Sequence, residues 1–336
     1  MKLVRLTREQ NAAVVQAMYA VISAAGRVTP SQQEVESVEA IQRHLFLQET
    51  PIAGTPGPLP ANLASVLATS ELRLQVVRLM AMLPAVDKTL PIEKVEVVEA
   101  AAKQLGVAEF GLVMLRRIAL KQYGRIMPKL TKQFVNYYWP ISGQPEARAW
   151  VSMWWSVMPW FPGLRRWLGL DDLLARYRGL EKLPQGTLGH AVHRYYADNG
   201  FPIPGSPKSI PEGWARHEIY HIISSYKPSL TGELLLAGFI AGNTQEMPLE
   251  IALPALVQLH AGRKFVPGPV AEDLLRPDEY FRAVARGAAM SIDLLRGWRL
   301  WEHADKRLED LRARYGLPEF DEEERRRLLE QDAVLA

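Results

Sequence analysis

Two histidines four residues apart, His217 and His221, lie in the stretch GWARHEIYHIISSYKPSLTGELLL, and Glu218 directly follows the first of them. On an α-helix the side chains at i and i+4 lie one above the other, so both imidazoles can reach one cation. Glu218 is offset by about 100° on the same helix, close enough to bind the ion or to hold a water beside it. The alternative is an amphipathic helix that carries two histidines and an exposed glutamate without any metal.

A third ligand is expected from Glu233, which stands twelve residues after His221. Pro228 and Ser229 end the first helix, and a second helix that begins near Thr231 carries Glu233 in its first turn. In a helical hairpin this carboxylate faces back toward the histidines. Two neutral nitrogens with carboxylate suit zinc or another divalent ion with an open position. We therefore predict a metal site formed by four residues, His217, Glu218, His221 and Glu233.

One chemistry for this pattern is zinc-dependent peptide hydrolysis. There the histidines bind zinc, and Glu218 is the catalytic general base on the metal-bound water. The third ligand of such a peptidase normally comes from further downstream than Glu233, because the active-site helix must finish and the chain must turn. The sequence also shows no alternating strand that could hold a substrate peptide. Both observations weigh against a peptidase.

Composition limits the classes of protein to which the chain can belong. Its 336 residues favour two domains, and 48% apolar with 23% charged residues is typical of a globular protein. A net charge of +3 is too small to indicate a nucleic-acid partner. The absence of cysteine excludes disulfides and suits the cytoplasm. The sequence predicts neither a signal peptide nor a transmembrane helix, so any membrane contact is expected to be peripheral, at the inner face.

Helical periodicity dominates the chain, and the predicted fold class is all-α. Apolar side chains recur at intervals of three and four residues from Glu9 to Ala25. Thr29 is expected to cap the next helix, with Pro30 at its first position. The order of helix, short turn, proline and helix recurs around Pro91, about sixty residues later. This recurrence predicts an internally duplicated helical bundle.

We expect two helical domains joined by an unusual connection. Residues 1–130 form the N-terminal bundle, and 171–320 form the C-terminal domain that carries the metal site. Between them, 131–170 holds many tryptophans beside arginines, a composition of helices at a membrane interface or of an aromatic core. Residues 321–336 are a charged tail. The segment from Glu9 to Val107, with turns AAGRVTPSQQE and AVDKTLPIEKVE, resembles the tellurite-resistance TerB-like helical domain.

Three stretches over about 171–318 carry a second resemblance: LPQGTLGHAVHRYYADNGF, HEIYHIISSYKPSLTGELLLAGF and GWRLWEHADKRLEDLRARYGLP. They resemble the coenzyme Q (ubiquinone) biosynthesis protein 4 family. That family has Leu-Pro-x-Gly-Thr-Leu/Phe-Gly, then His-Asp-x-x-His, then a Glu after eleven further residues. Here the patterns fall on Leu183 to Gly189, on His217 to His221 and on Glu233. Glu218 stands where the family has Asp, and Val192 where it usually has Tyr.

The resemblance implies a helical, peripheral membrane protein that binds a divalent metal, most simply zinc, and an isoprenoid lipid such as a prenylated quinone precursor. It implies a role in ubiquinone or related prenyl-lipid biosynthesis with other proteins of that pathway. The chain would act as a metal-dependent enzyme, with oxidative ring decarboxylation as the reaction, or as a lipid-presenting scaffold. A homodimer is allowed. The alternatives are a zinc metallopeptidase that uses HEIYH and a non-catalytic helical interaction module.

Overall fold

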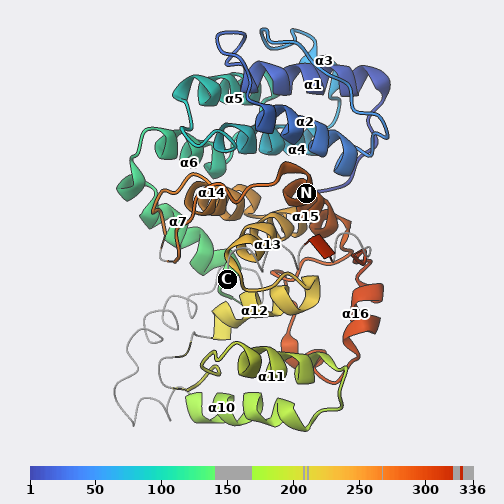
Figure 1. Cartoon of the computed structure of the whole chain (residues 1–336), viewed down its shortest axis with the longest axis vertical. Coiled ribbons are helices and arrows are strands. Elements are labelled where there is room, and N and C mark those ends of the chain that lie inside the picture. The colour runs from blue at the N-terminus through green and yellow to red at the C-terminus, as the bar shows by residue number, and fades with distance from the viewer. Residues whose placement is uncertain (141–168, 207–208, 210–211, 267, 321–325, 328–336) are drawn as a thin grey trace. The chain divides into compact units, whose positions relative to one another are not determined.

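The structure, a computed structural model, describes residues 1–140, 169–206, 209, 212–266, 268–320 and 326–327. Over these residues the chain forms fourteen α-helices, joined by loops and short 3-10 or π turns, and no strand (Figure 1). The all-α prediction is confirmed. The predicted tryptophan-rich connection falls largely on 141–168, and the predicted tail on 321–336. Both lie outside the described residues, except for 131–140 and 169–170 of the connection and 326–327 of the tail.

The N-terminal bundle contains two helix pairs. Its helices are α1 (Arg8–Ile22), α2 (Gln32–His44), the short α3 (Leu63–Val66), α4 (Ser70–Met82) and α5 (Ile92–Leu105). The ends of α1 and α4 lie 60 residues apart, and so do the starts of α2 and α5. The helix–turn–helix order therefore recurs in the structure with the spacing that the two prolines predict. The likeness to the TerB-like domain stays a prediction.

The start of α2 differs from the prediction at Thr29 and Pro30. The N-cap is Ser31, whose side chain accepts a hydrogen bond from the backbone N–H of Glu34. The Glu34 carboxylate in turn accepts the backbone N–H of Ser31 at 2.9 Å. This reciprocal capping box satisfies two of the unpaired N–H groups at the helix end. A cap at Thr29 would place Gln32 in that position, without the negative charge that favours a helix N-terminus.

A buried ion pair connects the two helix pairs at equivalent positions. Glu34 is the third residue of α2, and Lys94 is the third residue of α5. Lys94 Nζ lies 2.5 Å from Glu34 Oε1 and 2.9 Å from Asp87 Oδ2, and the Lys94 and Glu34 side chains are only 3% and 1% exposed. A charge buried this far from water is strongly destabilising unless an opposite charge lies beside it.

Replacing Lys94 by methionine should lower the free energy of unfolding by about 3 kcal/mol, because the Glu34 charge is left buried without a full counter-charge. Urea denaturation of the full chain measures the change. Adding Glu34→Gln keeps the capping box, removes the charge and should restore much of the loss. A loss for Lys94→Met below about 1 kcal/mol, the value of a solvated pair, would contradict a buried network.

The described chain forms two compact units, each discontinuous in sequence. Unit 1 contains Met1–Pro128, Pro228–Ala289 and the described residues from Glu319 onward; unit 2 contains Lys129–Lys227 and Met290–Pro318. Unit 1 therefore includes helices that the sequence-based division places in the range 171–320. The reason lies in their apolar surfaces, which pack onto the N-terminal helices. The predicted domain boundaries, 1–130 and 171–320, stay a prediction.

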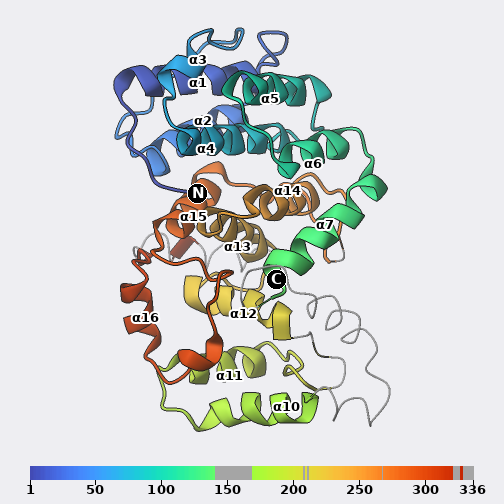
Figure 2. The ribbon, with the colours of Figure 1, turned by 180° about the vertical axis from the view of Figure 1, so that it is seen from behind.

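The centre of unit 1 is α13 (Leu230–Asn243), buried at twelve of its fourteen residues. A helix that is apolar on all sides needs cover on all sides. It packs against α14 (Pro248–Leu259) and α15 (Pro277–Ala289), while α15 also packs on α2 and α14 on α4 and α6 (Phe110–Ala119) (Figures 1 and 2). Glycines let α13 and α15 approach closely. A Cβ on Gly242 would lie 1.9 Å from the carbonyl oxygen of Val284.

A charged cluster joins α2 to α15 within unit 1. Asp278 accepts hydrogen bonds from Arg43 Nη1 at 2.5 Å, His44 Nε2 at 2.8 Å and Arg282 Nη2 at 2.7 Å. The hydrogen bond from His44 is the largest cause of a lowered pKa for Asp278, and the charge of Arg282 adds to it.

Asp278 should stabilise the fold at neutral pH and not in acid. A carboxyl pKa below that of the unfolded chain, about 3.9, gives stability that is present above this pH and lost as the pH falls toward the folded pKa. Asp278→Asn should therefore lower stability at pH 7 by about 1 kcal/mol, since the cluster is partly solvated. Near pH 3 the two proteins should differ less. Thermal unfolding at both pH values checks this, and an equal difference at each would contradict it.

Unit 2 contains α10 (Leu170–Gly179), α11 (Leu188–Asp198), α12 (Glu212–Ser224) and α16 (Leu308–Arg314), together with most of α7 (Met127–Gln133) and the π turn Phe134–Tyr138. The motif LPQGTLG lies at the start of α11, and His-Glu-x-x-His lies on α12. Thr187 is the N-cap of α11, and Gly186 has a left-handed φ of +83°. The backbone N–H of Leu188 donates to the carbonyl oxygen of Lys306, and the backbone N–H of Leu308 donates to the carbonyl oxygen of Gly186.

Close packing around Gly189, the last residue of the motif LPQGTLG, leaves no room for a side chain. A Cβ there would lie 2.4 Å from Leu183 Cδ1 and 2.9 Å from the carbonyl oxygen of Ala304. The N–H of Gly189 also donates to Ala304 at 2.8 Å. The motif therefore has a structural role in this chain, because it fixes the N-terminus of α11 against the segment that precedes α16.

Candidate metal centre

Helix α12 is held at both ends by buried or half-buried arginines. At its start, Arg216 donates to the carbonyl oxygens of Tyr138, Pro140 and Leu295, the second at 2.8 Å. At its end, Arg312 donates to the carbonyls of Ile222 and Ile223 at 2.7 and 2.9 Å. The last carbonyls of a helix have no partner within it, so this arginine supplies one. The rotation of α12, and with it the direction of its histidines, is thereby fixed.

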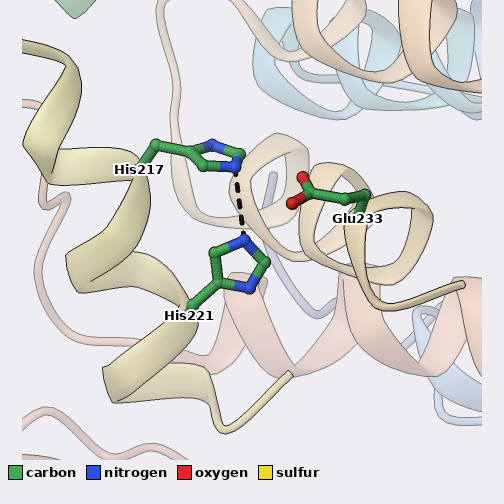
Figure 3. A group of neighbouring side chains, drawn as sticks. All are labelled: His217, His221 and Glu233. Carbon is green, nitrogen blue, oxygen red and sulfur yellow. Dashed lines mark hydrogen bonds between the residues drawn. The ribbon is translucent and has the colours of Figure 1, made fainter. Parts of the chain in front are cut away.

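The two predicted histidines face each other on α12. Their Nε2 atoms are 3.3 Å apart, and their rings lie almost perpendicular, at 83° (Figure 3). His221 is buried at 1% exposure, and its Nδ1 lies 2.9 Å from the carbonyl oxygen of Tyr226. A carbonyl only accepts, so Nδ1 carries the proton and the Nε2 of neutral His221 presents its lone pair toward His217. In metal sites, the ring nitrogen of a histidine that does not bind the metal typically donates its N–H to an acceptor such as a backbone carbonyl.

Glu233 completes a group of three. It lies in the first turn of α13, after the N-cap Ser229, and its carboxylate points toward the imidazole pair (Figure 3). One ligand atom from each of His217, His221 and Glu233 lies within 4.8 Å of the others. The helices α12 and α13 are joined by only five residues, 225–229. The three side chains lie on either side of this short turn, and their role as metal ligands stays a prediction. The second helix begins one residue before Thr231, at Leu230.

The donor set fits a divalent ion. Zinc takes nitrogen ligands at about 2.0–2.1 Å, and the edge of a tetrahedron of that size is about 3.3 Å. The distance between the two Nε2 atoms matches this edge. It also allows an N–H···N hydrogen bond in the absence of a metal. Two imidazoles and one carboxylate would hold the ion and leave at least one position for another ligand.

Glu218 lies outside this group. Its Oε2 accepts a hydrogen bond from the hydroxyl of Tyr195, on α11, at 2.9 Å. The ring of Tyr195 is also nearly parallel to that of His221, with centroids 5.9 Å apart and an interplanar angle of 21°. The sequence predicts Glu218 as a ligand and as the catalytic base, and both roles stay predictions. Tyr195 is a residue that sequence reasoning missed, because no spacing within α11 indicates a contact across to α12.

The other histidines have local partners. His190 and His193 lie side by side on α11 with ring centroids 6.5 Å apart, outside the three-residue group. His260 is fully buried and hydrogen-bonds the carbonyl of Val86, and burial lowers its pKa. His303 stacks on Trp298 at 17°. These contacts give His260 and His303 structural roles.

No family model matches the sequence, and no match is found among curated proteins. A solved structure that resembles the chain is that of a candidate ubiquinone biosynthesis protein from Nostoc punctiforme PCC 73102. It has 18% sequence identity and a TM-score of 0.30, and the match covers 75% of this chain and 100% of the other. A TM-score of this size does not establish a shared fold.

Among the described residues, no helix combines enough length with enough apolar character to pass through the hydrocarbon core of a bilayer.

Proposed function

We propose that the protein binds a divalent metal, zinc in the simplest case, through His217, His221 and Glu233. The observation that carries the proposal is the approach of three ligand atoms to within 4.8 Å of one another, with His221 held in the tautomer that a metal ligand needs. The acidic and imidazole side chains come from two helices joined by a short turn, so folding itself assembles them.

A divalent ion in this position would supply Lewis acidity, polarising a substrate oxygen that binds beside it. The chain's own residues would do the rest. His221 is oriented by the Tyr226 carbonyl, and Glu233 balances part of the positive charge. Glu218 stands beside His217 on α12, where its carboxylate can accept a proton from a molecule near the ion. The arrangement suits chemistry on an oxygen-bearing substrate.

For the substrate, we propose a role in ubiquinone or related prenyl-lipid metabolism. This part rests on the motifs LPQGTLG and His-Glu-x-x-His with Glu233, which resemble the coenzyme Q biosynthesis protein 4 family. The bound molecule would be a prenylated quinone precursor or another isoprenoid lipid, taken from the inner face of a membrane by peripheral contact. The protein would act as a metal-dependent enzyme, such as a ring decarboxylase, or as a lipid-presenting scaffold working with other proteins of quinone biosynthesis, as a monomer or a homodimer.

A peptidase is less well supported. Substrate peptides of such enzymes commonly add to an exposed strand, and the residues that the structure describes form none. The peptidase and the non-catalytic interaction module are therefore outcomes of the test below rather than equal proposals.

The test is to purify the full chain and measure its metal content and its extractable lipid by mass spectrometry. On the order of one divalent ion per chain with a prenylated quinone precursor or other isoprenoid lipid is the expected result. Metal without lipid, together with casein cleavage that is lost in Glu218→Gln, would establish a peptidase instead. Neither metal nor lipid would leave an interaction module and overturn the proposal.

A further inference from the structure

Tyr195 connects α11 to the helix that carries both histidines. Its hydroxyl donates to Glu218 Oε2 at 2.9 Å, and its ring lies nearly parallel to that of His221, with centroids 5.9 Å apart. The Tyr195 side chain therefore contacts both the candidate ligand His221 and Glu218, the residue directly after the second candidate ligand, His217. All these residues belong to unit 2, on the two neighbouring helices α11 and α12.

The position of Tyr195 is set by contacts that do not depend on Glu218. Its ring packs edge-on against Phe201, with centroids 5.9 Å apart and an angle of 64°. The side-chain amide of Asn199 donates to the backbone carbonyl of Tyr195 at 2.8 Å. Because the ring is fixed from several sides, its hydroxyl is a preorganised donor, and Glu218 is the group that adapts to it.

The hydrogen bond bears on how many protein ligands the ion can have. Glu218 is the residue after His217, so rotation of its side chain would bring the carboxylate toward an ion held by the histidines. Four protein ligands close a zinc site, whereas three leave a position for water or substrate. An ionised carboxylate accepts strong hydrogen bonds from hydroxyl groups. The hydrogen bond from Tyr195 would therefore have to break before Glu218 could bind the ion.

We propose that Tyr195 is a positioning residue that holds Glu218 outside the coordination shell and so keeps one position of the ion open. The inference rests on the metal site proposed above and defines its reactive form. His217, His221 and Glu233 bind the ion, Glu218 stays beside it, and a small anionic oxygen or nitrogen donor takes the open position. The first molecules expected there are carboxylates and phenolates, and azide can serve as their probe.

The test uses the full chain loaded with Co²⁺, whose visible spectrum reports the ligands around it. Azide titration of the wild type should change the spectrum to saturation. In Tyr195→Phe, which keeps the ring and its stacking, Glu218 should compete for the open position and weaken azide binding by about tenfold, the size of effect typical of groups that orient metal ligands. The double variant Tyr195→Phe/Glu218→Gln should bind azide like the wild type.

The matched control is Tyr196→Phe. Tyr196 is the next residue on α11, and its buried hydroxyl has no hydrogen-bond partner among the described residues, so its removal should leave azide binding unchanged. A wild type that does not bind Co²⁺ refutes the metal site and the inference with it. A wild type that binds Co²⁺ but not azide, a Tyr195→Phe protein equal to the wild type, or a double variant that is not restored leaves the metal site standing and overturns the role of Tyr195.

Discussion

Replacing His221 by alanine should lower the affinity for Zn²⁺ by at least about 100-fold. Groups that merely orient a ligand already account for 10- to 100-fold, and His221 is predicted to be a ligand itself. Its side chain is also the best prepared of the three, because burial and the Tyr226 carbonyl leave its Nε2 one direction in which to bind. Competition for Zn²⁺ against a chromophoric chelator at pH 7 measures the affinity.

The matched control for this experiment is His193→Ala on α11. It removes an imidazole from the same unit as the two candidate histidine ligands, outside the group of three residues, and should change the affinity by less than about twofold. Glu233→Gln should behave like His221→Ala, since the amide loses the charge that attracts the ion. Equal affinities in the wild type and in His221→Ala would show that any bound metal sits elsewhere on the chain.

Gly242→Ala should lower the free energy of unfolding by about 4 kcal/mol or more, a loss that single substitutions cause only when they produce severe steric or burial defects. The added Cβ would lie 1.9 Å from the carbonyl oxygen of Val284 and 2.8 Å from its carbonyl carbon. These are backbone atoms of α15, so no side-chain rotation relieves the overlap, and the two helices must separate. Gly287→Ala on α15 should have a similar effect, because its Cβ would lie 1.9 Å from the Phe239 carbonyl oxygen.

Urea denaturation of both variants, followed by circular dichroism, measures the loss. Gly124→Ala is the control in the same unit, because nothing lies within 4 Å of the added Cβ and the backbone there is not left-handed. It should stay within about 0.5 kcal/mol of the wild type. If Gly242→Ala were equally mild, α13 and α15 would not be packed backbone to backbone in solution.

Local sequence signals account for most of what could be predicted. The spacing of His217, His221 and Glu233, with Pro228 between them, is enough to predict two helices joined by a short turn, one with both histidines and the other with Glu233 near its start. Apolar periodicity and the recurring prolines predict the helix pairs of the N-terminal bundle. In each case the information lies within about one turn of helix or one short loop, so no knowledge of tertiary packing is needed.

Contacts between distant segments could not be predicted in this way. The packing of α13 to α15 with the N-terminal helices depends on which apolar surfaces meet, and periodicity does not say which. The Tyr195–Glu218 hydrogen bond likewise joins two helices whose mutual rotation is set by tertiary contacts. At Ser31 the cause is different: the observed cap lies two residues after Thr29, and Glu34, three residues beyond it, supplies the acid that forms the capping box.

The pairing of Glu34 with Lys94 also bears on how the N-terminal bundle could have arisen. The two residues hold the same place in the two helix pairs, yet they meet each other. In an ancestor with identical halves, such a position would have faced its own copy, and two buried like charges would have repelled. If the halves descend from one duplicated unit, the opposite charges were acquired after duplication. Since then neither half could be exchanged for a second copy of the other without placing like charges together.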